Sequence, residues 1–202
     1  MIYVIGIGPG DTSYLTQKGE AIIQKADIII GAQRNLESID KVTGTKIELS
    51  SKLSALTEYL EANLDKDIAV LASGDPLIYG IGKYLSEQFA ASQLTIIPGI
   101  SAVQYMFSKI PLDMNELYIT SSHGKKPDFN QILSYAKVAM VTDHLIGPAE
   151  IAQEILIRGL SKVIWIGENL TYPDEKISKT LPKDVKKGTK FKRNVVVILD
   201  EK

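Results

Sequence analysis

The alternation of two kinds of segment constrains this chain most. Short apolar runs, such as residues 2–5 and 68–72, alternate with stretches of helical periodicity, such as the leucines at 53, 56, 60 and 64. This alternation predicts an α/β fold, with helices on the faces of a mostly parallel sheet. We expect strands at residues 2–5, 27–30, 46–49, 68–72, 94–97, 117–120, 138–141, 163–166 and 195–199.

The alternation is interrupted once, at the segment IPLDMNE of residues 110–116. Pro111 ends the preceding helical pattern, and polar residues follow before the next apolar run. A chain of 202 residues is long enough for two small domains. We therefore predict an N-terminal α/β domain at residues 1–112 and a C-terminal α/β domain at residues 113–202.

Charge and composition exclude several classes of partner and chemistry. The formal net charge of −1 creates no field that would attract nucleic acid or anionic lipid. The absence of cysteine excludes disulfides, thiolate metal sites and thiol nucleophiles, and fits a reducing cytoplasm. The segment MIYVIGIGPGD reads as a first strand rather than a signal peptide, and no apolar run approaches the roughly 20 residues that span a bilayer. We expect a soluble cytoplasmic protein.

Glycine-rich or polar turns follow five of the predicted strands. Ligands of open α/β sheets bind outside the carboxyl ends of the strands. Five such turns at one edge therefore predict a cleft for a sizeable ligand, formed by GIGPGD, GDPLIYG, PGISA, VTDH and GENLTYPDE.

The first of these turns differs from a dinucleotide-binding loop. Its glycines are spaced GxGxG, and Pro9 lacks the backbone amide that such a loop would use. The second strand also ends at Gly31 rather than at an acidic residue for ribose hydroxyls. These differences disfavour a nicotinamide-dependent oxidoreductase.

Taken in order, the motifs resemble those of the tetrapyrrole methylase family over nearly the whole chain. GIGPGD, GDPLIYG and PGISA are similar to the N-terminal set of that family, and SSHGK, VTDH with GPAEIA, and GENLTYPDEKI resemble its branch for C-5 of precorrin-7. In its length, the chain is similar to the standalone enzyme of that branch rather than to the longer fusion with a C-15 enzyme. The resemblance implies two α/β domains with a cleft for S-adenosylmethionine (SAM) between them, a corrin precursor as substrate, a homodimer, and a separate partner for C-15 methylation and decarboxylation.

The resemblance also implies contacts to SAM from both domains. These are Pro9, Gly74, Asp75, Ile78, Ser101 and Ala102 in the first half, and Thr142, Glu168, Asn169 and Leu170 in the second. Ile78 and Leu170 would act mainly through their main chain. Asp75 and Ser101 have a second interpretation, since either could cap the helix that follows it.

The substrate carries many carboxylates, which basic residues would bind. Arg34, Lys83, Lys125 and Arg158 lie in or near the candidate loops, and we expect Arg34 and Lys125 to contact the substrate. Arg34 could instead be a solvated surface residue. Lys125 provides a point charge where the branch often has a planar guanidinium.

Acid–base chemistry has two candidates, Asp11 and His123. Asp11 could accept a proton or orient the macrocycle, or it could cap a helix. His123 could take up a proton at neutral pH, or it could be a hydrogen-bonded structural histidine. We expect no protein-bound metal, so any cobalt would arrive within the substrate. Two other hypotheses for the function remain open. The chain could be a family member that methylates another ring position, or a non-catalytic module that binds a nucleotide or a corrinoid.

Overall fold

The computed structural model describes residues 1–49, 52–124 and 127–201. It divides into two compact units, Met1–Ser101 and Ala102–Lys202. The division lies before the boundary expected after residue 112. The reason is that helix α5 (Ala102–Lys109) contacts strands β7 (Lys137–Val141) and β10 (Asn194–Asp200), and so belongs to the second unit.

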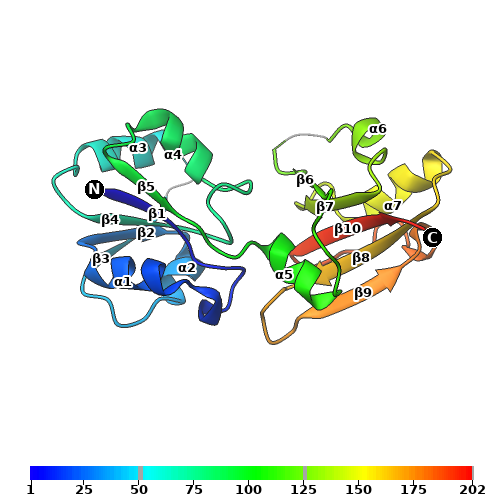
Figure 1. Cartoon of the computed structure of the whole chain (residues 1–202), viewed down its shortest axis with the longest axis horizontal. Coiled ribbons are helices and arrows are strands. Elements are labelled where there is room, and N and C mark those ends of the chain that lie inside the picture. The colour runs from blue at the N-terminus through cyan, green and yellow to red at the C-terminus, as the bar shows by residue number, and fades with distance from the viewer. Residues whose placement is uncertain (50–51, 125–126, 202) are drawn as a thin grey trace. The chain divides into compact units, whose positions relative to one another are not determined.

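The first unit contains a five-stranded sheet in which every pair of neighbours is parallel. The strand order is β3-β2-β4-β1-β5 (Figure 1). The central strands consist of residues buried on both faces, which is typical of a parallel sheet covered by helices on both sides. The strands are β1 (Ile2–Gly6), β2 (Ile28–Gly31), β3 (Thr45–Glu48), β4 (Ile68–Ala72) and β5 (Leu94–Ile97).

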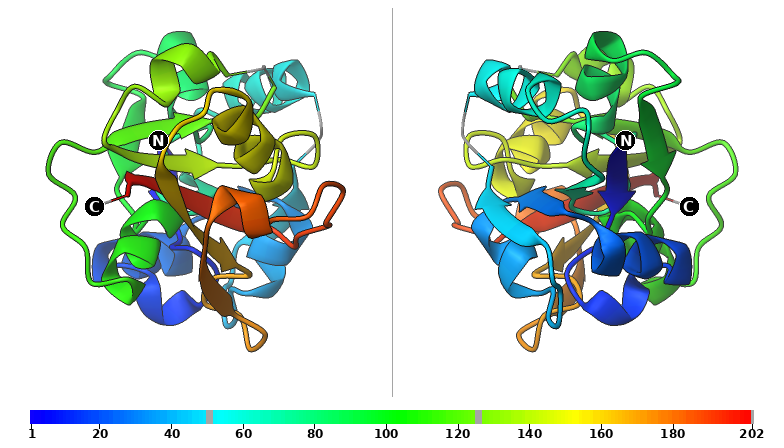
Figure 2. Two further views of the ribbon diagram at one scale, coloured as in Figure 1. Left: turned by 90° about the vertical axis from the view of Figure 1, so that its right-hand side faces the viewer. Right: turned by 90° about the vertical axis from the view of Figure 1, so that its left-hand side faces the viewer.

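Helices cover both faces of this sheet (Figure 2, right). Leu56, Leu60 and Leu85 pack with alternate strand residues on one face, whereas Ile23 and Leu36 pack with the intervening strand residues on the other. The helices are α1 (Gln17–Lys25), α2 (Gln33–Glu37), α3 (Leu53–Glu61) and α4 (Gly82–Gln88), with a 3₁₀ turn at Thr12–Tyr14.

The second unit contains a mixed sheet with the strand order β6-β7-β10-β8-β9. Strand β6 (Tyr118–Ser121) is parallel to β7, whereas β10 is antiparallel to both β7 and β8 (Lys162–Glu168), and β9 (Lys176–Thr180) is antiparallel to β8. The expectation of a mostly parallel sheet therefore holds only for the first unit. Strand β9 was not predicted, because its sequence KISKT has only one apolar residue.

Helices α6 (Phe129–Ile132) and α7 (Pro148–Ile157) pack on one face of the second sheet (Figure 2, left). Ile151, Ala152 and Ile155 of α7 are fully buried there. A second 3₁₀ turn lies at Pro182–Asp184 and contacts α7. Among the described residues, no helix is long and apolar enough to cross a membrane.

The topology places the candidate loops at defined edges. In the first unit, the residues after β1, β2, β4 and β5 all emerge at one edge, since these strands are parallel. In the second unit, β6, β7 and β8 share one direction, so the residues that follow them emerge at one edge, where β10 begins. Each turn does follow the carboxyl end of a strand, but the prediction that all five lie at one edge was wrong, because three belong to the first sheet and two to the second.

Candidate active site

Three glycine loops interlock at the carboxyl edge of the first sheet. Gly74 N donates a hydrogen bond to Gly8 O at 2.7 Å, which joins the loops after β1 and β4. A Cβ atom on Gly6 would lie 2.6 Å from Gly74 O, and one on Gly99 would lie 2.2 Å from the same oxygen. Only glycine permits this approach of three backbones. We call Gly6, Gly8, Gly74 and Gly99 the glycine junction.

Asp75 braces the glycine junction. Its Oδ1 accepts a hydrogen bond from Leu77 N at 2.8 Å, and its Oδ2 accepts one from Gly99 N at 3.1 Å. Helix α4 begins several residues later and has Ile81 at its N-cap position, so the alternative role of Asp75 as its helix cap was wrong. The carboxylate instead forms a local turn and links two loops.

Arg34 is held at the same edge, although it is exposed. Its Nη2 donates to Ser73 Oγ at 2.8 Å, and Ser73 Oγ donates to Oδ1 of the buried Asn35 at 3.2 Å. Ser73 directly precedes the glycine junction at the end of β4. The guanidinium is thus attached to a predicted cofactor loop, and the Ser73–Asn35 link that holds it was not predicted.

In the second unit, Thr142 joins the end of β7 to the start of β10. Its Oγ1 lies 2.8 Å from Asn194 Oδ1 and 3.1 Å from Asn194 O, and both residues are buried. Asn194 Nδ2 donates to Lys192 O, and Lys192 N donates to Glu168 Oε2. Thr142 and Glu168, far apart in the sequence, are therefore connected through Asn194 and Lys192, whose participation was not predicted.

The connection between β8 and β9 contains strained backbone. Asn169 and Thr171 have φ angles of +44° and +72°, in the left-handed region, which asparagine tolerates but a β-branched threonine rarely adopts. The conformation of Thr171 costs roughly 1–3 kcal/mol and persists only where the surroundings hold it. Asp174 Oδ2 accepts a hydrogen bond from Asn169 Nδ2 at 2.8 Å, and Glu175 Oε2 accepts one from Thr171 N at 2.7 Å.

A family model for tetrapyrrole (corrin/porphyrin) methylases matches residues 1–185. The chain belongs to the tetrapyrrole methylases. The chain is 42% identical to the cobalt-precorrin-7 C(5)-methyltransferase of Salmonella typhimurium, with all of both chains covered.

Two solved structures share the fold of this tetrapyrrole methylase. The precorrin-6Y methylase of Archaeoglobus fulgidus superimposes with a TM-score of 0.79 at 22% identity, covering 100% of this chain and 99% of that one. The uroporphyrin-III C-methyltransferase of Thermus thermophilus, complexed with S-adenosylhomocysteine (SAH), superimposes with a TM-score of 0.81 at 17% identity, covering 98% of this chain and 96% of that one. The predicted fold class is confirmed.

Several predicted cofactor residues of the methylase have buried side chains. Ser101 is 4% exposed, and Leu170 is 6% exposed. A Cβ atom on Gly167 would lie 2.8 Å from Leu170 Cδ2, so the Leu170 side chain packs over the end of β8. Pro9 and Ile78 are half-buried, and Ile78 N donates to Asp75 O at 3.3 Å. A contact from Leu170 would thus use its main chain.

The two acid–base candidates differ in their surroundings. Asp11 caps the 3₁₀ turn by accepting a hydrogen bond from Ser13 N at 2.8 Å. That bond, with one from the Ser13 side chain, lowers the pKa of Asp11, which makes it a weaker base. His123 is exposed, and its Nδ1 lies 3.2 Å from Ser121 Oγ. The capping interpretation of Asp11 describes its observed contacts.

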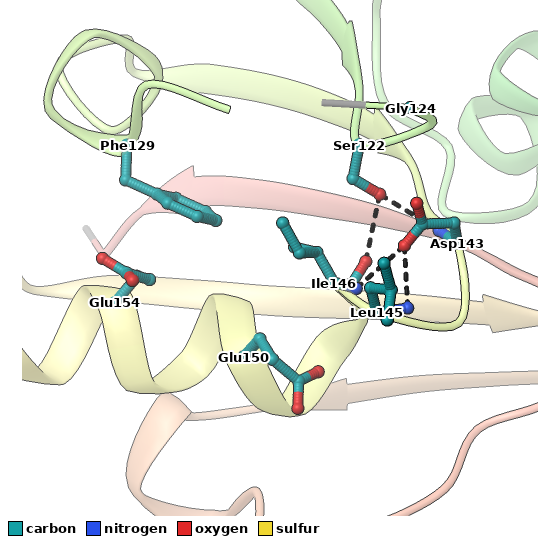
Figure 3. A pocket seen from close by; sticks show the side chains of 8 residues that line it. All are labelled: Ser122, Gly124, Phe129, Asp143, Leu145, Ile146, Glu150 and Glu154. Atoms are coloured by element: carbon teal, nitrogen blue, oxygen red, sulfur yellow. Dashed lines mark hydrogen bonds between the residues drawn. The ribbon is translucent and has the colours of Figure 1, made fainter. Parts of the chain in front are cut away.

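A pocket of about 560 Å³ lies within the second unit, between α6, α7 and the loops after β6 and β7 (Figure 3). Its apolar wall is formed by Phe129, Leu145 and Ile146. Its polar and small lining residues are Ser122, Gly124, Asp143, Glu150 and Glu154. Hydrogen bonds from Ile146 N and Leu145 N hold the pKa of Asp143 below its ordinary value. Because these carboxylates repel anions, the pocket does not suit the carboxylates of a corrin precursor.

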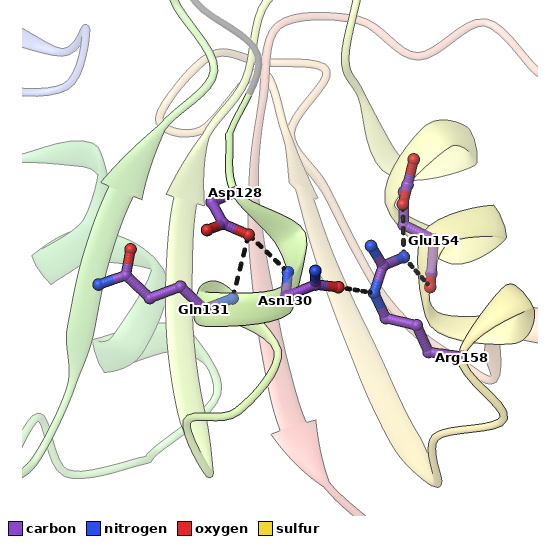
Figure 4. A network of polar contacts seen from close by, with 5 residues as sticks. All are labelled: Asp128, Asn130, Gln131, Glu154 and Arg158. Carbon is purple, nitrogen blue, oxygen red and sulfur yellow. Dashed lines mark hydrogen bonds and ion pairs between the residues drawn. The ribbon is translucent and has the colours of Figure 1, made fainter.

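Of the other basic residues considered, Arg158 makes its contacts within the second unit (Figure 4). Its Nη1 pairs with Glu154 Oε2 at 2.5 Å, and its Nε donates to Asn130 Oδ1 at 2.9 Å. Lys83 pairs with Glu87 on the exposed face of α4. Lys125 lies outside the described residues. Of the described substrate-binding candidates, Arg34 is therefore the one that contacts a predicted cofactor loop.

The second unit should lose stability at acidic pH. The ion pair with Lys137 lowers the pKa of Asp113, and the pair with Lys192 lowers that of Asp174. A carboxyl group whose folded pKa is lowered stabilises the fold fully above its ordinary value of 3.8, and this contribution disappears as the pH falls through the folded pKa.

We expect the urea midpoint of the second unit to fall modestly below about pH 4, because both ion pairs are exposed to solvent, and to change little just above about pH 5. The single tryptophan, Trp165, lies in β8, so its fluorescence reports on this unit. Repeating the titration in about 1 M salt should reduce the fall, because both pairs are exposed to solvent and screened. A midpoint that stays constant down to pH 3 would contradict this expectation.

Proposed function

We propose that this tetrapyrrole methylase transfers a methyl group from SAM to C-5 of cobalt-precorrin-7, or of precorrin-7, giving the corresponding precorrin-8 in corrin ring biosynthesis. The full-length match to the cobalt-precorrin-7 C(5)-methyltransferase, at 42% identity, carries this proposal. Because both chains are covered completely, the similarity includes both units and all the candidate loops.

The glycine junction fits a ligand that approaches the backbone closely. The close packing of these glycines brings three loop backbones together at the carboxyl edge of the sheet, where ligands of such sheets bind, so a nucleoside bound there could contact main-chain groups. Each carboxylate oxygen of Asp75 accepts one backbone hydrogen bond and keeps a second acceptor position for a ribose hydroxyl or an amine. Pro9, Gly74, Asp75, Ile78 and Ser101 provide the contacts of the first unit in this proposal, and Ala102, Thr142, Glu168, Asn169 and Leu170 those of the second.

When bound, SAM supplies a methyl group that is already activated by the sulfonium. The enzyme's contribution would then be alignment: the loops would hold the donor with its methyl group in line with the nucleophilic ring carbon. The carbon is nucleophilic through conjugation with pyrrolic nitrogen, so no covalent bond to the enzyme forms.

The residues around the macrocycle bind carboxylates and move a proton. Arg34 binds a substrate carboxylate, since its guanidinium is fixed by Ser73 at the edge of the glycine junction. In this proposal, Lys125 binds a second carboxylate of the substrate. Methyl transfer to the neutral ring leaves a positive charge on the macrocycle, which is removed when the macrocycle loses a proton. His123 accepts that proton in preference to Asp11, whose lowered pKa makes it a poor base at neutral pH.

The decisive experiment is mass spectrometry after incubation of the enzyme with labelled SAM and a panel of precorrin intermediates. We expect one labelled methyl group at C-5 of precorrin-7 or its cobalt form, and we expect calorimetry to detect binding of SAH but not of NAD. A methyl group at another ring carbon would assign a different position within the family. SAH binding without methylation of any intermediate would favour a non-catalytic binding module.

The proposal includes a cytoplasmic homodimer and a separate enzyme for the C-15 step. Sedimentation of the purified chain tests the dimer. Incubation of the methylated product with a C-15 methyltransferase tests whether that product is the next enzyme's substrate.

A further inference from the structure

Glu175 connects two segments of the second unit that the proposed function assigns to the cofactor. Its Oε2 accepts a hydrogen bond from Thr171 N at 2.7 Å, within the strained connection after β8. Its Oε1 lies 3.1 Å from Lys109 Nζ, at the end of α5. The carboxylate is only 20% exposed. One side chain thus contacts both the turn that carries Asn169 and the helix that begins at Ala102.

On the α5 side, the link pairs the buried Tyr105 with Lys109, whose side chain is 41% exposed. Lys109 Nζ lies 5.2 Å from the centre of the Tyr105 ring, and Tyr105 is 7% exposed. Burial, followed by the interaction with Glu175, raises the pKa of Tyr105, and the contacts with Tyr105 and Glu175 raise the pKa of Lys109. The lysine therefore stays charged opposite the carboxylate.

Burial opposes the ionisation of Glu175, but bonds from Thr171 N, Tyr105 and Lys109 outweigh it, so the net shift of the Glu175 pKa is downward. The group is ionised at neutral pH. A charged acceptor makes a stronger hydrogen bond to a backbone amide than a neutral one does, which suits a turn that needs to be held against strain.

A second contact joins the same two segments. A Cβ atom on Gly167 would lie 2.5 Å from Met106 Sδ of α5 and 2.8 Å from Leu170 Cδ2. Helix α5 and Leu170 therefore both pack directly on the end of β8. By contrast, the outer brace of the turn, Asp174 with Lys192, is about half exposed and is screened by solvent.

We propose that Glu175 is a positioning residue that holds the turn at Asn169–Thr171 in its cofactor-binding conformation and fixes that turn to α5. Ala102 and Asn169 are then carried by one rigid body within the second unit. This inference rests on the proposed function for the identity of the ligand, but the bracing itself is a property of the chain without ligand.

The test compares four variants of the full chain: Glu175→Ala, Glu175→Gln, Lys109→Met and the double variant Glu175→Gln/Lys109→Met. Glu87→Gln is the matched control, because it removes the charge of another ion-paired glutamate on exposed α4. Calorimetry measures the Kd for SAH, steady-state kinetics separate KM for SAM from kcat, and hydrogen exchange reports the protection of the Thr171 amide.

We expect Glu175→Ala to expose the Thr171 amide to exchange and to raise the Kd for SAH about tenfold. The KM for SAM should rise while kcat is largely retained. Glu175→Gln keeps an acceptor for Thr171 N, so it should restore most of the affinity and leave a loss of about threefold. Lys109→Met should raise the Kd for SAH by about as much as Glu175→Gln does. The double variant should raise the Kd no further than either single variant, because each single substitution already removes the same ion pair. The control should match the wild type.

Wild-type affinity for SAH in Glu175→Ala, with the Thr171 amide still protected, would overturn the inference. If Glu175→Ala does not fold, the double variant decides, and additive losses in Glu175→Gln and Lys109→Met would overturn it. If the wild type binds no SAH while Glu175→Ala still exposes the Thr171 amide, the proposed function fails and the bracing role stands.

Discussion

Replacing Gly99 with alanine is expected to abolish SAH binding and to destabilise the first unit by about 3 kcal/mol or more. The new Cβ would lie 2.2 Å from Gly74 O and 2.7 Å from both the C and the Cα of Gly6. Backbone atoms cannot move aside as a flexible side chain can, so the loops after β1, β4 and β5 have to separate. Both the fold and the site depend on these loops.

Calorimetry with SAH and hydrogen exchange of the β1 and β4 amides measure the two effects of Gly99→Ala. The matched control is Gly147→Ala, where the new Cβ would meet nothing closer than Glu150 Oε2 at 3.7 Å and the φ angle of −118° suits any residue. That control should leave the affinity unchanged and cost no more than about 1 kcal/mol of stability, because Gly147 is the N-cap of α7 and alanine is a poorer N-cap than glycine. A Gly99→Ala protein that binds SAH like the wild type would show that the close approach of the loops is not needed for binding.

Replacing Asp75 with alanine is expected to weaken SAH binding by about tenfold to a hundredfold while the fold is retained. The substitution removes the acceptor of both Leu77 N and Gly99 N. Hydrogen bonds to charged groups contribute about 1.5–3 kcal/mol each when buried, and Asp75 is half-buried, so we expect a total loss of stability of about 2 kcal/mol. In the proposed function, the ligand also loses a carboxylate partner.

Asp75→Asn separates the two roles of this residue. The amide keeps one oxygen acceptor but places a donor opposite one of the two backbone N–H groups, so stability and affinity should both be intermediate. Thermal unfolding gives the stability and calorimetry gives the affinity. If Asp75→Ala lowers the melting temperature but leaves the SAH affinity unchanged, Asp75 only braces the loops and does not contact the ligand.

The strands of the first sheet were predictable because local pattern and tertiary environment agree there. Strand β4, with the sequence IAVLA, is buried on both faces, and a continuous apolar run of this kind predicts such burial. In the second unit the same kind of run, VVVIL in β10, belongs to a strand that is antiparallel to both neighbours. An apolar run records burial but not direction, so the mixed sheet could not be predicted from it.

The candidate site was predictable only to the level of loops. The resemblance selected GIGPGD, GDPLIYG and GENLTYPDE, but not the side chains that hold them. The residues around Asn194 give no indication that it contacts Thr142. Glu175 lies in one of the selected motifs, but nothing in that motif indicates that it pairs with Lys109 of α5. Such pairs are separated by 52 and 66 positions, and only chain folding brings them together.

The sequence by itself determined the family, the order of the elements other than β9, and the loops that we propose to meet the ligand, because periodicity and glycine placement are local properties of the chain. Only the tertiary structure decided where the units divide, which strands run antiparallel, and that Asp75 links two loops instead of capping α4. These depend on contacts between distant residues, and the free energy of such a contact is set by the packing and hydrogen bonding of both partners rather than by either one alone.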